Sequence, residues 1–295
     1  MLPLLVALTS PAMADVRVVA SLPDLAAVAQ QVGGDHVTVT AMALPTQDPH
    51  FVDAKPNLAL ALSRADLLLL VGLDMEIGWL PTLVTASRNP RIQKGTDGYV
   101  DCSHYVQVLD VPAGPIDRTM GDLHGGGNPH YFYDPRAMVA VAHGIAQRLA
   151  AVDPDNTADY QAGAVAFEAA ISQARPGWEE RLAPLRGAAV IGYHHSWTYL
   201  ADWLGFEVVA DVEPKPGIPP APAHVAKVVG AAQQRNVSVV LIESFYPDTT
   251  ARLVADKGGA NLVKLTAGTD FASGETYPEH IDAWVDALAI AGGGP

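Results

Sequence analysis

The chain of 295 residues is long enough for two domains, and 49% hydrophobic against 17% charged residues favours a large packed interior over disorder. Its formal net charge of -14 argues against nucleic acids and anionic membranes as partners and favours a cationic ligand. The single cysteine, Cys102, excludes an intramolecular disulfide and a thiolate zinc cluster, so any metal site must use histidine and carboxylate ligands.

The first 14 residues have the features of a secretory signal peptide. An apolar run precedes Ala12-Met13-Ala14, which matches the small-residue pattern of a cleavage site, and the run is too short to span a membrane. The basic leading segment of such a signal is missing. We therefore expect a truncated signal peptide over residues 1–14, a mature chain that begins at Asp15, and a periplasmic location.

The first half of the chain alternates strand and helix patterns. Five runs have the residue preferences of strands: 16–21, 37–42, 66–72 and, more weakly, 98–101 and 105–109. Helical patterns occupy residues 26–32, 57–65 and 77–87. This alternation predicts a mostly parallel sheet covered by helices. His50 comes directly after Pro49 in the loop behind the second strand, and such loops carry the ligand sites of open α/β sheets.

Residues 122–135 combine a glycine-rich loop with a fixed turn. The glycines place Asp122 and His124 on a flexible loop, whereas Asn128-Pro129 restricts the backbone just before His130. A histidine held in this way beside an acidic, histidine-bearing loop suggests a metal site. A surface loop with incidental histidines is the alternative.

A long helical segment separates the two halves. Asp134-Pro135 has the pattern of a helix start and opens an amphipathic helix. Residues 153–186 then predict one extended helix, which Arg175-Pro176-Gly177 should kink or interrupt. We expect this helix to be a stiff connection between two lobes.

The second half repeats the order of strand, histidine and helix. Four runs predict strands: 188–192, 206–210, 237–242 and 262–265. Helical patterns follow each of them, the last one over residues 277–291, and the proline-dense residues 213–222 predict a rigid extended loop. The predicted fold is therefore α/β with two lobes, each a mostly parallel sheet flanked by helices, joined by one long rigid helix. The expected boundaries are 15–152 for the N-terminal lobe, 153–186 for the linking helix and 187–295 for the C-terminal lobe.

Four loop positions combine the chemistry of metal ligands with a place beside a predicted strand or helix: His50, His130, His194 and Asp270. Three imidazoles and one carboxylate form a set that Zn²⁺ accepts in a tetrahedral array. His195 is an alternative to His194. Glu243, at the end of a predicted strand, competes with Asp270 for the fourth position, but we favour it as the hydrogen-bond partner of a ligating histidine.

Short motifs that occur in a fixed order carry a family resemblance: Asp48-Pro49-His50, Asn128-Pro129-His130, Asp134-Pro135, Tyr193-His194 and Thr269-Asp270 followed by Tyr277. Over essentially the whole mature chain, this order resembles the metal-binding solute-binding proteins of ABC importers for zinc and manganese. The resemblance implies two α/β lobes that hold the metal between them through His50, His130, His194 and Asp270. It also implies a monomer that works with an ABC transporter membrane permease, and that is not an enzyme.

The third ligand position bears on the choice of metal. For manganese-type members, the family resemblance implies a carboxylate at this position. Here His194 adds a third imidazole, which suits Zn²⁺ better than the harder Mn²⁺. The expected cargo is therefore zinc, with manganese or another divalent metal as the alternative. The sequence departs from the family pattern at His195, where aspartate is frequent. It departs again at residues 122–127, which replace a longer histidine-rich insertion and which we interpret as a flexible capture loop containing Asp122 and His124. A periplasmic zinc donor protein is a possible further partner.

A zinc-dependent hydrolase is the alternative from another class of protein. Three histidines and a carboxylate also occur in catalytic sites, which keep an open position for water beside a general base. Glu243 is the candidate base, but it is not part of a helical H-E-x-x-H pattern.

Overall fold

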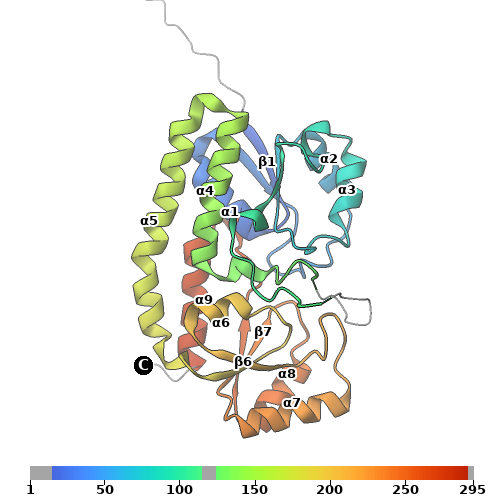
Figure 1. Ribbon diagram of the computed structural model, residues 1–295, viewed down its shortest axis with the longest axis vertical. Coiled ribbons are helices and arrows are strands. Elements are labelled where there is room, and N and C mark those ends of the chain that lie inside the picture. Colours follow the sequence, from blue (N-terminus) through green and yellow to red (C-terminus); the bar gives the residue numbers. More distant parts are fainter. Residues whose placement is uncertain (1–14, 115–123, 292–295) are drawn as a thin grey trace, which may run out of the picture.

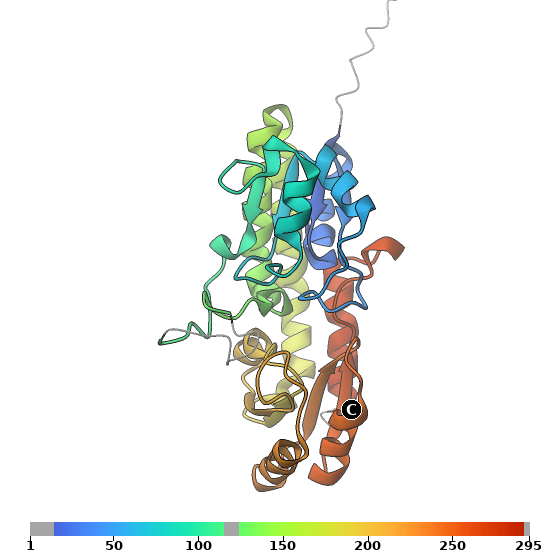
Figure 2. The same ribbon diagram turned by 90° about the vertical axis from the view of Figure 1, so that its right-hand side faces the viewer.

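The computed structural model describes residues 15–114 and 124–291 of the chain. The predicted signal peptide and Asp122 lie outside these residues. Two parallel sheets form the centres of two lobes, which are stacked along the longest axis of the molecule (Figure 1 and Figure 2). Helices cover the sheets and a long helix runs beside both lobes, so the predicted fold class is confirmed.

Both sheets have the same strand order. The N-terminal sheet has the order β2-β1-β3-β4, with β1 (Val16–Ala20), β2 (Val37–Ala41), β3 (Leu67–Leu70) and β4 (Tyr99–Asp101). The C-terminal sheet has the order β6-β5-β7-β8, with β5 (Ala189–Gly192), β6 (Glu207–Asp211), β7 (Val239–Glu243) and β8 (Asn261–Leu265). Neighbouring strands are parallel in every pair. In each sheet the winding direction changes beside the first strand, and ligands of open α/β sheets bind at such points.

The helices pack around these sheets and connect them. Those of the first lobe are α1 (Pro23–Gly33), α2 (Pro56–Arg64), α3 (Leu80–Ser87) and α4 (Pro135–Val152). Those of the second part of the chain are α6 (Thr198–Leu204), α7 (Pro222–Gln234), α8 (Thr249–Gly258) and α9 (Tyr277–Ala291). Between the two sets, α5 (Thr157–Arg181) packs on α1, α4 and α9 and reaches from one lobe to the other (Figure 1).

The long helix differs from the prediction at its proline. α5 continues through Pro176 to Arg181, where the sequence predicted a kink or an interruption. Trp178, which follows the proline, is 2% exposed, donates its indole N–H to Asp282 of α9 and meets Trp203 edge to face. These tertiary contacts hold the turn after the proline, so the single backbone bond lost at Pro176 does not end the helix.

Most predicted strands are present with ends that differ by one or two residues, but residues 105–109 do not form a strand. Tyr105 instead ends a 3₁₀ turn, Cys102–Tyr105. The chain then crosses toward the second lobe, where the backbone N–H of Leu109 donates to the hydroxyl of Tyr199 over 3.0 Å. The alternating pattern gave a wrong prediction here, because Val106 and Leu109 are half-buried against the largest apolar cluster and do not belong to a sheet.

The largest buried apolar cluster includes residues from both lobes and from α5. Tyr133, just after the predicted ligand His130, stacks on Trp197, with ring centroids 5.3 Å apart, and also contacts Trp284 of α9. Aromatic pairs of this kind contribute about 0.5–1.5 kcal/mol beyond the burial of their area. This packing fixes the segment of His130 against the segment of His194. In the part of the chain that the structure describes, no helix combines the length and apolar character needed to cross a membrane.

Candidate metal centre

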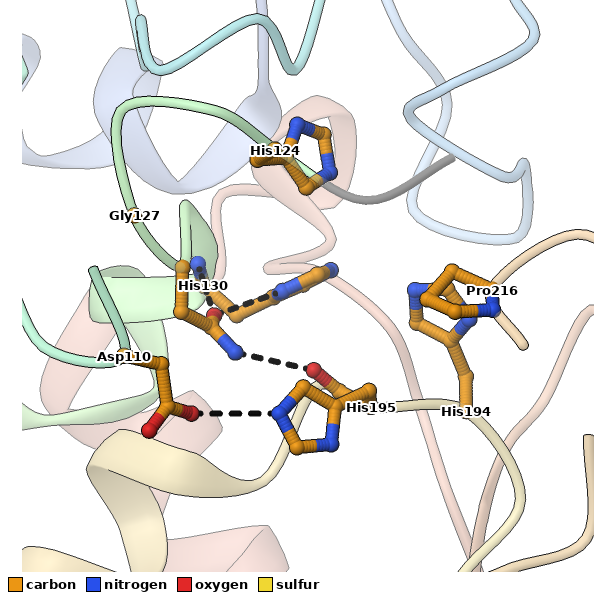
Figure 3. A pocket seen from close by; sticks show the side chains of 8 residues that line it. Asp110, His124, Gly127, His130, His194, His195 and Pro216 are labelled. Atoms are coloured by element: carbon orange, nitrogen blue, oxygen red, sulfur yellow. Dashed lines mark hydrogen bonds and ion pairs between the residues drawn. The ribbon is translucent and has the colours of Figure 1, made fainter. Parts of the chain in front are cut away.

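Three buried imidazoles meet where the two lobes come together. His50 lies in the loop after β2, His130 opens a 3₁₀ turn before α4, and His194 follows β5. Their exposed fractions are 9%, 3% and 4%, and one potential ligand atom of each lies within 4.8 Å of those of the other two. His130 and His194 border the same space in Figure 3. Of the predicted ligands, the structure therefore brings these three together.

Two of the histidines are each held by a local turn of the same kind. In Asp48-Pro49-His50, the carboxylate Oδ1 of Asp48 accepts both the backbone N–H and the ring Nδ1–H of His50, each over 2.9 Å. In Asn128-Pro129-His130, Oδ1 of Asn128 makes the equivalent pair of hydrogen bonds to His130, each over 3.0 Å. Because Nδ1 carries the proton in each ring, the lone pair of Nε2 is available for a metal.

The third histidine is oriented by a residue of the proline-dense loop. Nδ1 of His194 lies 2.8 Å from a carboxylate oxygen of Glu213, and both side chains are buried. The backbone N–H of Glu213 donates to the carbonyl of Tyr193, which continues the pairing of β5 with β6 and places Glu213 beside His194. Gly192 leaves room for the side chains of Trp197 and Asp211, because a Cβ atom there would lie 2.6 Å from Trp197 and 2.7 Å from Asp211. His194 therefore also presents Nε2 to the centre.

The protonation states of the residues in this group favour the binding of a cation. Burial, together with the neighbouring histidines, holds the pKa of His130 well below its usual value, so the ring is neutral at physiological pH. Burial alone would raise the pKa of the Asp48 carboxyl, but its hydrogen bonds with His50 outweigh burial and leave that pKa lowered. An ionised carboxylate thus lies behind one ligand ring, where it increases the basicity of the ring.

His195 has a different environment from its neighbour. Its Nδ1 pairs with Asp211 over 2.8 Å and its Nε2 with Asp110 over 3.1 Å. These two hydrogen bonds raise the pKa of His195 to about 10, so the ring is a cation with both nitrogens occupied. Asp110 belongs to the segment that precedes α4, and Asp211 ends β6, so His195 joins the two lobes and does not point a free nitrogen into the group.

His124 lies beside the group of three imidazoles. Its Nε2 is 3.2 Å from Nε2 of His50, and the ring centroids of these two histidines are 5.3 Å apart. Burial, followed by the neighbouring His50 and His194, lowers the pKa of His124 to about 3, so this ring is also neutral. His124 and His130 both line the pocket drawn in Figure 3. Its predicted companion, Asp122, is outside the described residues.

The two predicted carboxylates are placed elsewhere. Asp270 is exposed, and its backbone N–H donates to Glu275; its carboxylate does not belong to the group formed by the three histidines. Glu243 is buried and hydrogen-bonded to the hydroxyl of Ser196, and Glu213 occupies the place beside a ligating imidazole that we expected for Glu243. Burial raises the pKa of Glu243 to about 8.

The residues that orient the rings were missed as such by the sequence analysis. The repetition of Asx-Pro-His at residues 48–50 and 128–130 was a usable signal, because a short polar side chain ahead of proline can accept hydrogen bonds from the residue two places on. Glu213 had no comparable signal, since its position depends on how β6 pairs with β5.

Comparison with known proteins gives one family for the chain. The family model described as "Zinc-uptake complex component A periplasmic" matches residues 18–291. The relatives include the high-affinity zinc uptake system protein ZnuA of Paracoccus denitrificans (strain Pd 1222), which is 26% identical over 230 residues and 67% of each chain. The iron-binding protein YfeA of Yersinia pestis is 25% identical over 92% of this chain and 85% of its own length.

Solved structures show the same fold. A crystal structure of ZnuA has a TM-score of 0.77 at 24% identity and covers 95% of this chain and 100% of its own. The solute-binding protein FpvC of Pseudomonas aeruginosa, in complex with Mn²⁺, also has a TM-score of 0.77, at 23% identity, and covers 94% of this chain and 98% of its own.

Proposed function

The chain belongs to the family of periplasmic zinc-uptake component A proteins, and we propose that it is a zinc receptor that binds Zn²⁺ between its lobes and delivers it to a membrane permease. The family consists of metal-binding substrate-binding proteins of ABC importers, which work with a membrane permease and are not enzymes. The relatives are named for zinc, iron and manganese, so the proposal of zinc rests on the chemistry of the site.

The observation that supports zinc most directly is the all-nitrogen character of the group. His50, His130 and His194 contribute the close group of potential ligand atoms, and no carboxylate of the described residues belongs to it. Imidazole suits Zn²⁺, whereas Mn²⁺ favours carboxylate, carbonyl and water oxygens. Manganese or another divalent metal is the alternative cargo within the same family. Binding requires neutral imidazoles, so the affinity is expected to fall as the solution is acidified.

The size of the pocket supports an ion as the cargo. The pocket beside His130 and His194 has a volume of about 60 Å³. This is room for a metal ion and a few waters, whereas pockets for organic ligands typically hold about 300–1,000 Å³. Glu243, the candidate base of a hydrolase, is bonded to Ser196 and does not line this pocket.

Several properties of the receptor extend this proposal. We expect a monomer exported through residues 1–14, divided into the lobes 15–152 and 187–295 and the linking segment 153–186. A periplasmic zinc donor protein is a further proposed partner. The side chains of Asp122 and His124 are proposed to attract the arriving ion, because the ring of His124 lies beside that of His50.

Metal analysis of the purified protein tests the proposed function. The protein isolated from a periplasm should contain about one zinc per chain, as a one-site receptor requires. His130→Ala should abolish this zinc content, whereas His143→Ala should not, because His143 lies on the surface of α4 and pairs with Glu168. Retention of zinc by His130→Ala, or manganese as the bound metal in the unaltered protein, would contradict the proposal.

A further inference from the structure

The feature that goes beyond the three-histidine group is the position of His124. Its Nε2 lies 3.2 Å from Nε2 of His50. In a tetrahedral site with Zn–N distances of 2.0–2.1 Å, two ligand nitrogens are separated by about 3.3 Å. The two imidazoles thus already have the separation of neighbouring ligands on one zinc ion.

Contacts around the other rings and near His124 support the same interpretation. The backbone of Leu73 lies close enough to the His124 imidazole to interact with it. Leu73 has a φ of 51°, in the left-handed region that a branched residue rarely adopts, and strained backbone of this kind concentrates at functional sites. The rings of His50, His130 and His194 each have an oxygen partner on the side away from the centre, from Asp48, Asn128 and Glu213.

This arrangement has an electrostatic consequence. When His50 and His124 each donate a proton outward, their two Nε2 atoms face each other with lone pairs at 3.2 Å. Two lone pairs at this distance repel, whereas a cation between them converts the repulsion into two coordination bonds.

The described carboxylates do not compete for the fourth position in this arrangement. Asp270 is exposed, Asp110 and Asp211 are paired with His195, and Glu213 is on the outer side of His194. His124 is outside the closest group of three. The ring centroids of His124 and His130 are 6.3 Å apart and would move closer around an ion.

We propose that His124 is the fourth zinc ligand, so that the cargo is bound by four imidazoles, those of His50, His124, His130 and His194. This inference rests on the proposed function and deepens it. It assigns the fourth ligand to the segment ahead of α4 in place of Asp270, and it removes the remaining oxygen ligand. A site with four nitrogens discriminates more strongly against Mn²⁺ than a site with three nitrogens and a carboxylate.

X-ray absorption at the zinc edge tests the proposal, because outer-shell scattering counts the imidazoles around the ion. The full-length protein loaded with Zn²⁺ alone is compared with His124→Gln, Asp270→Asn and the surface control His143→Gln. We expect four imidazoles in the unaltered protein, three in His124→Gln and four in both other variants. The zinc affinity of His124→Gln should fall by about 100-fold or more, since loss of even an outer-shell partner costs about 10–100-fold.

The outcomes separate this inference from the function on which it rests. Three imidazoles in the unaltered protein, with an unchanged count in His124→Gln, would overturn the role of His124, whatever the affinity of the variant. A loss of affinity in Asp270→Asn would assign the fourth position to Asp270 and leave the zinc receptor intact. Failure of the unaltered protein to bind zinc tightly would overturn the proposed function itself.

Discussion

Replacement of Glu213 by glutamine tests whether the residues behind the imidazoles set the metal affinity. The carboxylate of Glu213 lies 2.8 Å from Nδ1 of His194, and both side chains are buried. Glutamine has nearly the same shape and can still accept a hydrogen bond, but it carries no charge. The variant therefore removes the negative charge behind the ligand while it preserves the packing.

The magnitude follows from the strength of that hydrogen bond. A net hydrogen bond to a charged group contributes about 1.5–3 kcal/mol and a neutral one about 0.5–1.5 kcal/mol. The difference, about 1–1.5 kcal/mol, corresponds to roughly a tenfold loss of zinc affinity in Glu213→Gln. Glu213→Ala removes the partner altogether, and we expect a loss of up to about 100-fold, the upper end for outer-shell residues of metal sites.

Competition with a chromophoric zinc chelator at neutral pH measures these changes. Glu207→Gln is the matched control, because Glu207 lies on β6, the strand that leads to Glu213, but is exposed and pairs with Arg235. Its affinity should equal that of the unaltered protein. The reasoning is refuted if Glu213→Gln and Glu207→Gln bind zinc equally well while His194→Ala does not.

Three further predictions concern buried or paired ionisable groups. Hydrogen bonds with Asp110 and Asp211 raise the pKa of His195 to about 10. The charge of His195 therefore stabilises the folded protein fully below pH 6.5, and this contribution is lost as the pH rises toward 10. The melting temperature of His195→Gln should decline less at alkaline pH than that of the unaltered protein. Burial raises the pKa of Glu76 to about 7. Between pH 4.5 and 7 the folded state therefore keeps a proton that the unfolded state has lost. The free energy of unfolding should fall by roughly 2–4 kcal/mol as the pH rises over that range. Denaturant unfolding of Glu76→Gln should lack most of this fall, and an unchanged pH profile would show that the carboxyl is not the cause. Glu243→Gln should leave zinc affinity unchanged in the chelator assay, because Glu243 bonds to Ser196 and not to a ligand ring; a clear loss would restore its predicted role beside the metal.

The parts of the site that could be predicted are those determined by local sequence. Proline fixes the backbone before His50 and His130, and a polar residue two places ahead of each histidine supplies the hydrogen-bond acceptor. The strand pattern of residues 188–192 likewise placed His194 at the end of a central strand, where the structure has it. Short-range preferences and one buried strand were sufficient for these three positions.

The parts that could not be predicted depend on contacts between distant segments. Glu213 reaches His194 only through the pairing of β6 with β5, and Asp270 is exposed because of how the chain turns after β8. Pro176 was expected to break α5, but packing of Trp178 against α9 and Trp203 outweighs the local preference. Composition also could not indicate that the glycine-rich loop brings His124 to within 3.2 Å of His50.

Competitive titration of the metal-free protein with Zn²⁺ and Mn²⁺ tests the central claim most directly. A group of neutral imidazoles without a carboxylate ligand predicts that zinc displaces manganese stoichiometrically, and that His194→Ala weakens zinc binding far more than His143→Ala. A preference for Mn²⁺, or zinc affinity that His194→Ala leaves undiminished, would contradict the account.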